Sequence, residues 1–296
     1  MTKDAVSIGD HVSIKLDGVH EAFGSMFDGI QSGFKEIRIG NSPTSSSDGV
    51  LSIGIKGDPS RSAVSSMEFT KNSVTAVAFA DLGSGIIRSG LKGTGGNGEV
   101  LLIVLVDANM PVSTMARAMI TANEGVTAVI QDLGLRYGSA FATGSVKQDI
   151  LIVCRKDLGI RLRGSGNHCK LGELIGATAI EAVRESASNN GMSIETRRSI
   201  IDRMAEYGYT KDDLLAICQS SVSEDVIVSR DSDGKALSGV LSVLHICDCI
   251  GWGLIPEAEG TKAGRDIIRT VFGTVPEEGR LIDSLAESVA RYLFMR

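Results

Sequence analysis

Three clusters of polar residues carry groups that could do acid–base or hydrolytic chemistry. The first, Thr121–Gly125, places Glu124 in the middle of an expected helix whose other residues are small and mostly apolar. This composition predicts a largely buried helix, and a buried carboxylate without a partner is disfavoured unless the protein uses it. Two interpretations stay open for Glu124: a functional carboxylate, or an ordinary side chain on a solvated helix face.

The second cluster, Ala142–Asp149, comes directly before an expected core strand. It supplies the hydroxyls of Thr143 and Ser145, the backbone of Gly144 and the carboxylate of Asp149. These groups could bind or orient a substrate. An ordinary turn, in which Asp149 accepts hydrogen bonds from backbone amides, is the structural alternative.

The third cluster, Gly164–Glu173, lies at the start of another expected helix. Its functional candidates are Gly164, Ser165, Gly166, Asn167, His168, Lys170 and Glu173. Glycines let a backbone approach a ligand closely, and helix N-terminal amides can hold an anion or a developing oxyanion. His168 titrates in the range that suits general acid–base catalysis. We interpret this cluster as functional, although a lone histidine is more often structural.

Other kinds of site have weaker support. If the segment 245–249 is a strand, His245, Cys247 and Cys249 lie on one face of it. If it is a helix, Cys247 points away from the other two, and no metal site is predicted. The glycine-rich segment Gly83–Gly98 lacks the spacing of a phosphate-binding loop, which favours a mobile surface loop over a lid on a ligand. No nucleophile elbow of the G-x-S-x-G type occurs at a strand-to-helix turn.

The three clusters lie between alternating strands and helices. Val100–Val106 is a continuous apolar run, which predicts a strand buried on both faces, and 149–154 is predicted as a second one. Apolar residues at helical spacing predict helices over 115–131 and 170–187. Shorter strands are predicted at 11–16, 36–39, 50–55 and 74–80. The pattern predicts an α/β fold, a layered mixed sheet with packed helices.

The chain becomes mostly helical after a break at Asn189–Gly191. Helices are predicted over 195–207, after an N-cap at Thr210, and over 261–272 and 277–294, with a short strand at 224–230. We therefore predict two domains. Residues 1–192 form the α/β domain, and residues 193–296 form a C-terminal extension that is mostly helical with a short strand.

Composition limits the classes of function. The 296 residues include 30 Lys and Arg and 36 Asp and Glu, and the net charge of −6 disfavours binding to nucleic acid. The apolar stretches at 100–106 and 240–255 are interpreted as too short or too broken to span a membrane, and no secretory signal is predicted. Five cysteines, an odd number, fit free thiols in a reducing compartment, so a cytoplasmic protein is expected.

The order of the clusters resembles the adenosylcobinamide amidohydrolase family of corrinoid salvage. Val106–Met110 is similar to the family's D-A-x-L/M turn, and Thr121–Val126 lies where the family has A-T-E-A-K. Thr143–Asp149 is similar to T-G-T-x-T-D, and Gly164–Gly176 is similar to Y-A-G-P-A-T-x-x-G-x-L-I-G. The resemblance covers about 90 residues, Val100 to Ala187. Each block is weak alone, but their order and spacing together are fairly specific.

This sequence departs from the family pattern at three places. Val126 replaces the lysine of A-T-E-A-K, Gln148 replaces the second threonine of T-G-T-x-T-D, and Asn167–Cys169 replaces P-A-T. The chain is therefore identified as a divergent member, and the last change puts the identity of the substrate in question.

The resemblance implies hydrolysis of the amide between the corrin propionate and aminopropanol, giving adenosylcobyric acid without a cofactor. Glu124 or His168 would then activate water, and Asn167 with the Gly164–Gly166 amides would hold the oxyanion. Thr143 and Asp149 would orient the substrate or the base. A non-catalytic corrinoid-binding protein and an amidase for a related tetrapyrrole are the alternatives. The expected ligand is a small corrinoid. Binding to nucleic acid or to a membrane is not expected, and a homo-oligomer is left open.

Overall fold

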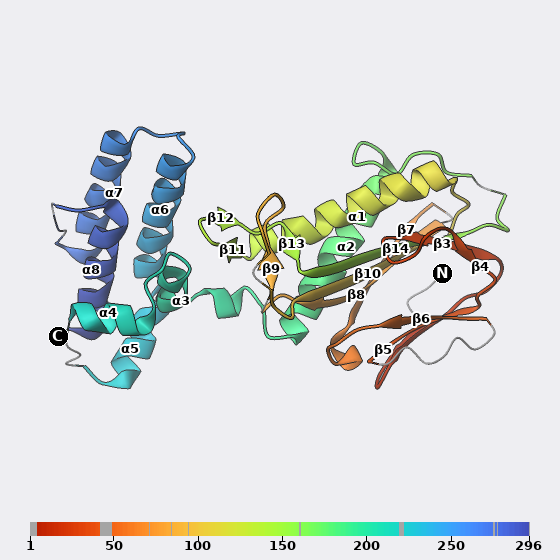
Figure 1. Ribbon diagram of the computed structural model, residues 1–296, viewed down its shortest axis with the longest axis horizontal. Helices are drawn as coiled ribbons and strands as arrows, with labels where there is room; N and C mark the ends of the chain where they lie inside the picture. The colour runs from red at the N-terminus through yellow and green to blue at the C-terminus, as the bar shows by residue number, and fades with distance from the viewer. Residues whose placement is uncertain are drawn as a thin grey trace. The chain divides into compact units, whose positions relative to one another are not determined.

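The computed structural model describes residues 5–41, 49–70, 72–83, 85–93, 95–159, 161–218, 222–274, 276 and 278–295. The chain divides into two compact units (Figure 1). The first unit comprises residues 1–137 and 141–193, and the second comprises residues 194–296 with 138–140. Each unit has a hydrophobic core of its own, so each is described by itself.

A six-stranded sheet forms the centre of the first unit, in the order β4-β3-β14-β10-β8-β7. The neighbours β10 and β14 are parallel, and the other pairs in this sheet are antiparallel. The strands are β3 His20–Gly24, β4 Gln31–Ser32, β7 Ala63–Phe69, β8 Asn72–Asp81, β10 Glu99–Val106 and β14 Lys147–Arg155. The sequence predicts β8, β10 and β14 of this sheet, but not β3, β4 or β7.

Every residue of β10 is buried, which confirms the prediction of a strand buried on both faces. Leu102 and Val104 face the helices α1 and α2, whereas Leu101 and Ile103 face a second sheet. Side chains alternate between the two faces of a strand, so a strand covered on both sides must be apolar at every position.

The helices α1 Val112–Asp132 and α2 Lys170–Asn189 cover one face of the six-stranded sheet (Figure 1). They pack closely at Gly125, where a Cβ atom would lie 3.0 Å from Ala179 Cβ and 3.4 Å from the Gly176 carbonyl oxygen. Glycine is unfavourable inside a helix. Here the close approach of the two helices accounts for its presence.

The opposite face is covered by a four-stranded sheet in the order β1-β2-β5-β6 (Figure 1). Its strands are β1 Val6–Ile8, β2 Val12–Lys15, β5 Glu36–Gly40 and β6 Val50–Gly54. An ion pair joins the layers: Lys147 Nζ, on a half-buried side chain, bonds to Glu99, which is 2% exposed, and donates to the Gly54 carbonyl at 3.0 Å. The first unit is thus a layered α/β structure with mixed sheets, as predicted.

Part of the glycine-rich segment at 83–98 pairs with the residues that precede β14. Its strand β9, Ile86–Ile87, pairs with β13, Gly144–Ser145. The amides of Thr143 and Val146 extend this pairing by donating to Ile87 and Gly85 at 2.8 Å each. Nearby, β11 Arg136–Tyr137 pairs with β12 Ala140–Phe141. Ser84 and Thr94 lie outside the described residues.

From residue 194 on, the regular elements among the described residues of the second unit are all helices. Its elements are η3 Glu195–Arg197, α3 Ile200–Ala205, α4 Lys211–Ile217, α5 Glu224–Asp231, α6 Gly234–Gly251, α7 Glu257–Phe272 and α8 Leu281–Phe294. The amphipathic α8 contributes the largest share of the buried side chains, including Leu285, Val289 and Phe294. At Thr210 a capping box confirms the predicted helix start, because Thr210 and Asp213 each bond to the other's backbone amide.

Two predictions for the second unit are wrong. The strand at 224–230 is the helix α5, in which only Ile227 is buried, while Val226 and Val228 are exposed. The β-branched residues favoured a strand, but acidic residues at the first two helical positions stabilise the helix start. The single helix at 195–207 is also interrupted, because the Ser199 hydroxyl accepts from the Asp202 amide and starts α3 afresh.

Among the described residues, α6 is long and apolar enough to cross a membrane by length and composition alone. A core helix of a soluble protein passes the same test, so this is weak evidence. Val240, Val243 and Leu244 of α6 are buried in the core of the helical unit.

Candidate functional site

Two of the predicted clusters meet at the surface of the first unit. Asn167 Nδ2 donates a hydrogen bond to Glu124 Oε2 at 2.5 Å, although 43 residues separate them in the chain. Both side chains are exposed. The contact joins the middle of α1 to the turn before α2, so a carboxylate, an amide and a helix N-terminus lie together.

Glu124 is exposed, which corrects the expectation that its helix buries it. The buried face of α1 runs through Met115, Ala118, Ala122, Val126 and Val129, and Glu124 lies outside that stripe. The apolar neighbours belong to the core face, as the helical period allows. Glu124 therefore needs no buried partner, and water can reach its carboxylate.

Two hydroxyl groups fasten the turn that carries Asn167 to α1. Thr121 Oγ1 donates to the Ser165 carbonyl at 3.0 Å, and Ser165 Oγ donates to the Thr114 carbonyl at 2.7 Å. All three residues are buried. Ser165 was a candidate for substrate binding, but the structure places its side chain inside the protein, where it holds the turn.

The turn also lies directly against the first residues of α2. A Cβ atom on Gly172 would stand 2.0 Å from the Gly166 carbonyl oxygen, and Gly166 is itself buried. Only glycine permits so close an approach. Cys169 begins α2 without a side-chain cap, so the helix presents backbone amides beside Asn167. Gly164 remains exposed at the other end of the turn.

In the second cluster, Gln148 rather than Asp149 joins the helix side of the sheet. Gln148 Nε2 donates to Asn123 Oδ1 at 2.6 Å, and Gln148 Oε1 accepts from the Ser145 amide at 3.0 Å. Asp149 is in register with Leu101, whose side chain faces the four-stranded sheet.

Asp149 therefore lies on the opposite face from Glu124 and Asn167, and it accepts a hydrogen bond from Ser25 Oγ at 3.1 Å. This corrects its assignment as a residue that orients the base. The reason is the two-residue period of a strand, in which a shift of one position reverses the face. The family motif T-G-T-x-T-D has six positions, so counting from Thr143 places Lys147 at the last threonine and Gln148 at the aspartate. This corrects the alignment of Gln148 with a threonine.

Thr143 connects the second cluster to two neighbouring segments. Thr127 Oγ1, on α1, donates to the Thr143 carbonyl at 2.9 Å, and the Ser89 amide donates to Thr143 Oγ1 at 2.9 Å. Gly144 and Ser145 are buried in the pairing with β9. These contacts give Thr143, Gly144 and Ser145 a role in shaping the edge of the site rather than its exposed surface.

The remaining members of the third cluster are exposed. His168 lies over the turn, where a Cβ on Gly166 would be 3.1 Å from His168 Cε1 and 3.6 Å from Arg117 Cδ. Lys170 and Glu173 bond to each other at 2.6 Å along the outer face of α2. An exposed pair of this kind contributes little stability and leaves both side chains accessible.

Sequence reasoning did not find Arg117, Asn123 and Thr127 on α1. Arg117 precedes Glu124 by seven residues, which places both on one face of the helix, two turns apart. A signal was present in the sequence, because the polar residues at 117, 121, 123–124 and 127 can be sorted by helix face. Without knowing which face of α1 the sheet covers, however, that sorting does not select a site.

The residues considered for a metal form no coordinating set. His245, Cys247 and Cys249 lie on the helix α6, where Cys249 Sγ is 3.6 Å from His245 Nε2 and Cys247 points elsewhere. Burial raises the pKa of the Cys247 thiol to about 11, which disfavours the thiolate that binds metals. Across the described ranges, no group of three or more His, Cys, Asp or Glu is placed to hold a metal ion.

The first unit is therefore a layered α/β domain that brings a helix-borne carboxylate to a glycine-rich helix start, an arrangement suited to hydrolysis. Its residues 58–193 match the model of the family described as adenosylcobinamide amidohydrolase, which confirms the resemblance seen in the sequence. The match runs from before β7 to just beyond α2 and includes all four resembling blocks. It supports hydrolase chemistry for this unit.

A curated relative is similar over a shorter stretch. An uncharacterized protein of Methanocaldococcus jannaschii is 34% identical over 92 residues, which are 30% of this chain and 35% of that protein. The chain thus covers about a third of the length of this relative. The limited identity agrees with a divergent member of the family.

Proposed function

We propose that the first unit hydrolyses the amide of adenosylcobinamide that joins the corrin propionate to aminopropanol, giving adenosylcobyric acid. The family match over residues 58–193 supports this substrate and reaction. The single observation that carries the proposal is the 2.5 Å contact between Glu124 and Asn167, because it unites two motif blocks at an exposed carboxylate.

Glu124 acts as the general base in this proposal. Its carboxylate takes a proton from water as the water oxygen attacks the amide carbon. The Asn167 amide and the first amides of α2 stabilise the oxyanion that develops on the carbonyl oxygen. The C–N bond then breaks and the proton held by Glu124 passes to the leaving nitrogen, giving a carboxylic acid and an amine. The acid then passes its proton to the amine, so the final products are a carboxylate and an ammonium group.

Arg117 and His168 border the same turn and contribute positive charge or a hydrogen bond to the substrate. Arg117 lies on the Glu124 face of α1, and His168 lies over Gly166. His168 is the alternative base. We propose a small corrinoid as the ligand and the cytoplasm as the compartment, which the five free cysteines support. Neither nucleic acid nor membrane has a part in the proposed reaction.

The proposal is tested by incubating the protein with adenosylcobinamide and analysing the products by mass spectrometry. The wild type is expected to release aminopropanol, and Glu124→Gln is expected to be about 100-fold slower or more, because it removes the base and keeps the shape. Glu185→Gln is the matched control, since Glu185 is an exposed carboxylate on α2.

The result also separates the alternatives. Full activity in Glu124→Gln together with loss of activity in His168→Ala would transfer the role of base to His168. A change in the visible spectrum of the corrinoid without any product would indicate a corrinoid-binding protein. Neither a spectral change nor a product would show that the altered block at 167–169 selects a different ligand.

A further inference from the structure

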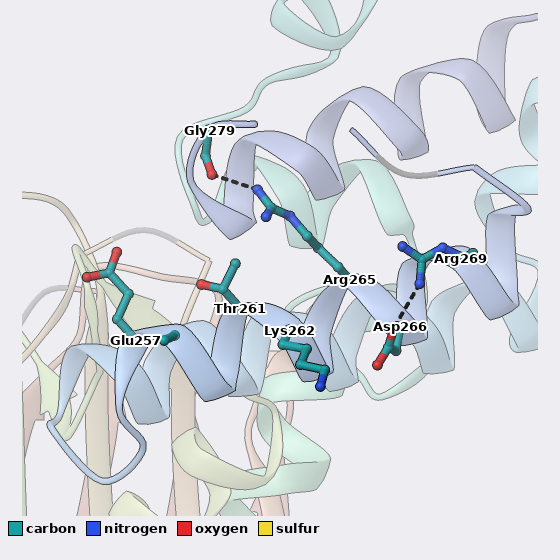
Figure 2. A pocket seen from close by; sticks show the side chains of 8 residues that line it. Glu257, Thr261, Lys262, Arg265, Asp266, Arg269 and Gly279 are labelled. Atoms are coloured by element: carbon teal, nitrogen blue, oxygen red, sulfur yellow. Dashed lines mark hydrogen bonds and ion pairs between the residues drawn. The ribbon is translucent and has the colours of Figure 1, made fainter. Parts of the chain in front are cut away.

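A surface hollow of about 730 Å³ lies along α7 in the helical unit (Figure 2). It is lined by Glu257, Ala258, Thr261, Lys262, Arg265, Asp266, Arg269 and Gly279. Small-molecule sites commonly have volumes of about 300–1,000 Å³. The hollow therefore has the size of a small ligand, and the family match at 58–193 does not include it.

Three cations and two carboxylates line the hollow. Lys262, Arg265 and Arg269 recur along α7, and the Asp266 carboxylate accepts from Arg269 Nη1 at 2.7 Å (Figure 2). Glu257, the other acidic residue, precedes Lys262 by five residues, which is about 7.5 Å along the helix axis. Positive charge thus predominates around Lys262 and Arg265.

Arg265 is held in place without a carboxylate partner in the part of the chain that the structure describes. Its Nη2 donates to the Gly279 carbonyl at 2.9 Å (Figure 2). Its Nε is buried and has no hydrogen-bond acceptor among the described residues. Lys262 is exposed and likewise makes no ion pair with a described residue. Two cations that are paired with no described carboxylate therefore border one hollow.

We propose that this hollow binds the phosphate group of a small phosphorylated ligand. A guanidinium fixed by a backbone carbonyl is ordered in advance and retains donors for phosphate oxygens. Lys262 adds a second positive charge, and the Thr261 hydroxyl adds a neutral donor on the same lining. This site is independent of the proposed hydrolysis, because its residues all belong to the second unit.

The test is isothermal titration calorimetry of the full chain with pyrophosphate at fixed ionic strength. The wild type is expected to bind, and Lys262→Ala and Arg265→Ala are each expected to weaken binding by about tenfold or more, because each removes a charged donor. Lys235→Ala is the matched control, because Lys235 is an exposed lysine in the first turn of α6, outside the hollow.

Lys262→Ala decides the outcome if Arg265→Ala fails to fold, because the Lys262 side chain is exposed and its loss is expected to leave the fold intact. Absence of binding by the wild type would overturn the proposal. Equal weakening by Lys235→Ala and Lys262→Ala would also overturn it, since that result indicates diffuse attraction between charges. Loss of binding only in the variants of the hollow would support it.

Discussion

His20 is a buried titratable residue at the edge of the first unit's central sheet. It is 3% exposed, and its Nδ1 has no hydrogen-bond partner among the described residues. It is in register with Arg155, and Asp17 and Asp157 also act on its charge. Burial is the largest influence and lowers the pKa of His20 below 6.5. The fold therefore favours the neutral ring.

The pKa of His20 predicts a loss of stability in acid. Above pH 6.5 the ring is neutral in both states, and below it the unfolded chain takes up the proton more readily than the folded protein. The free energy of unfolding should therefore fall as the pH is lowered from about 7 to 5. Thermal melts should show a smaller fall in His20→Gln than in the wild type.

His11→Gln serves as the control for this prediction, because His11 is exposed in the same unit. It should retain the acid sensitivity of the wild type. An equal fall in all three proteins would show that carboxylates, and not His20, cause the loss.

The helix α2 contains two glycines, Gly172 and Gly176, with opposite effects on its stability. Gly172 faces the backbone of the turn, with the Gly166 oxygen 2.0 Å from a Cβ atom and the Ser165 oxygen 2.8 Å away. Gly176, one turn later, has nothing within 4 Å of such an atom. Gly172 lets the turn pack onto the helix. Gly176 has no such role, and it only adds conformational freedom to the unfolded chain, which lowers the stability of the helix.

The two alanine substitutions in α2 should therefore change stability in opposite directions. Gly176→Ala should raise the free energy of unfolding by about 0.5–1 kcal/mol, because alanine is the better helix former. Gly172→Ala should lower it by about 1–3 kcal/mol, because backbone atoms must move. Urea denaturation measures both, and stabilisation by Gly172→Ala would contradict the packing described for the turn.

At the scale of the whole molecule, the two units have separate cores. Leu285 is fully buried in the core of the helical unit, and Leu102 is fully buried between β10 and the helices of the α/β unit. Each core draws its residues from one unit only. A cavity in one core should therefore weaken that unit first.

Leu285→Ala should cost the helical unit about 2–5 kcal/mol, which is typical of a buried leucine. Hydrogen exchange followed by mass spectrometry should show faster exchange in α6, α7 and α8 and unchanged exchange in β10 and α2. Leu102→Ala should give the reverse pattern. Equal acceleration in both units after either substitution would show that they unfold as one.

The sequence alone determined those elements whose local residue pattern indicates whether they are buried or where they begin. The unbroken apolar run of β10 required burial on both faces, the periodic α1 and α2 required one covered face, and Thr210 with Asp213 specified a helix start. These are local patterns, so they could be interpreted without knowing what packs against them. The ordered motif blocks likewise indicated the family before any contact was known.

Long-range packing decided which polar side chains share a surface. It placed Gln148 on the helix side and Asp149 on the other side, because strand register assigns every residue to a face. It exposed Glu124 by covering the opposite side of α1. Neighbours distant in the sequence set register and burial, and no local pattern records which neighbours those are.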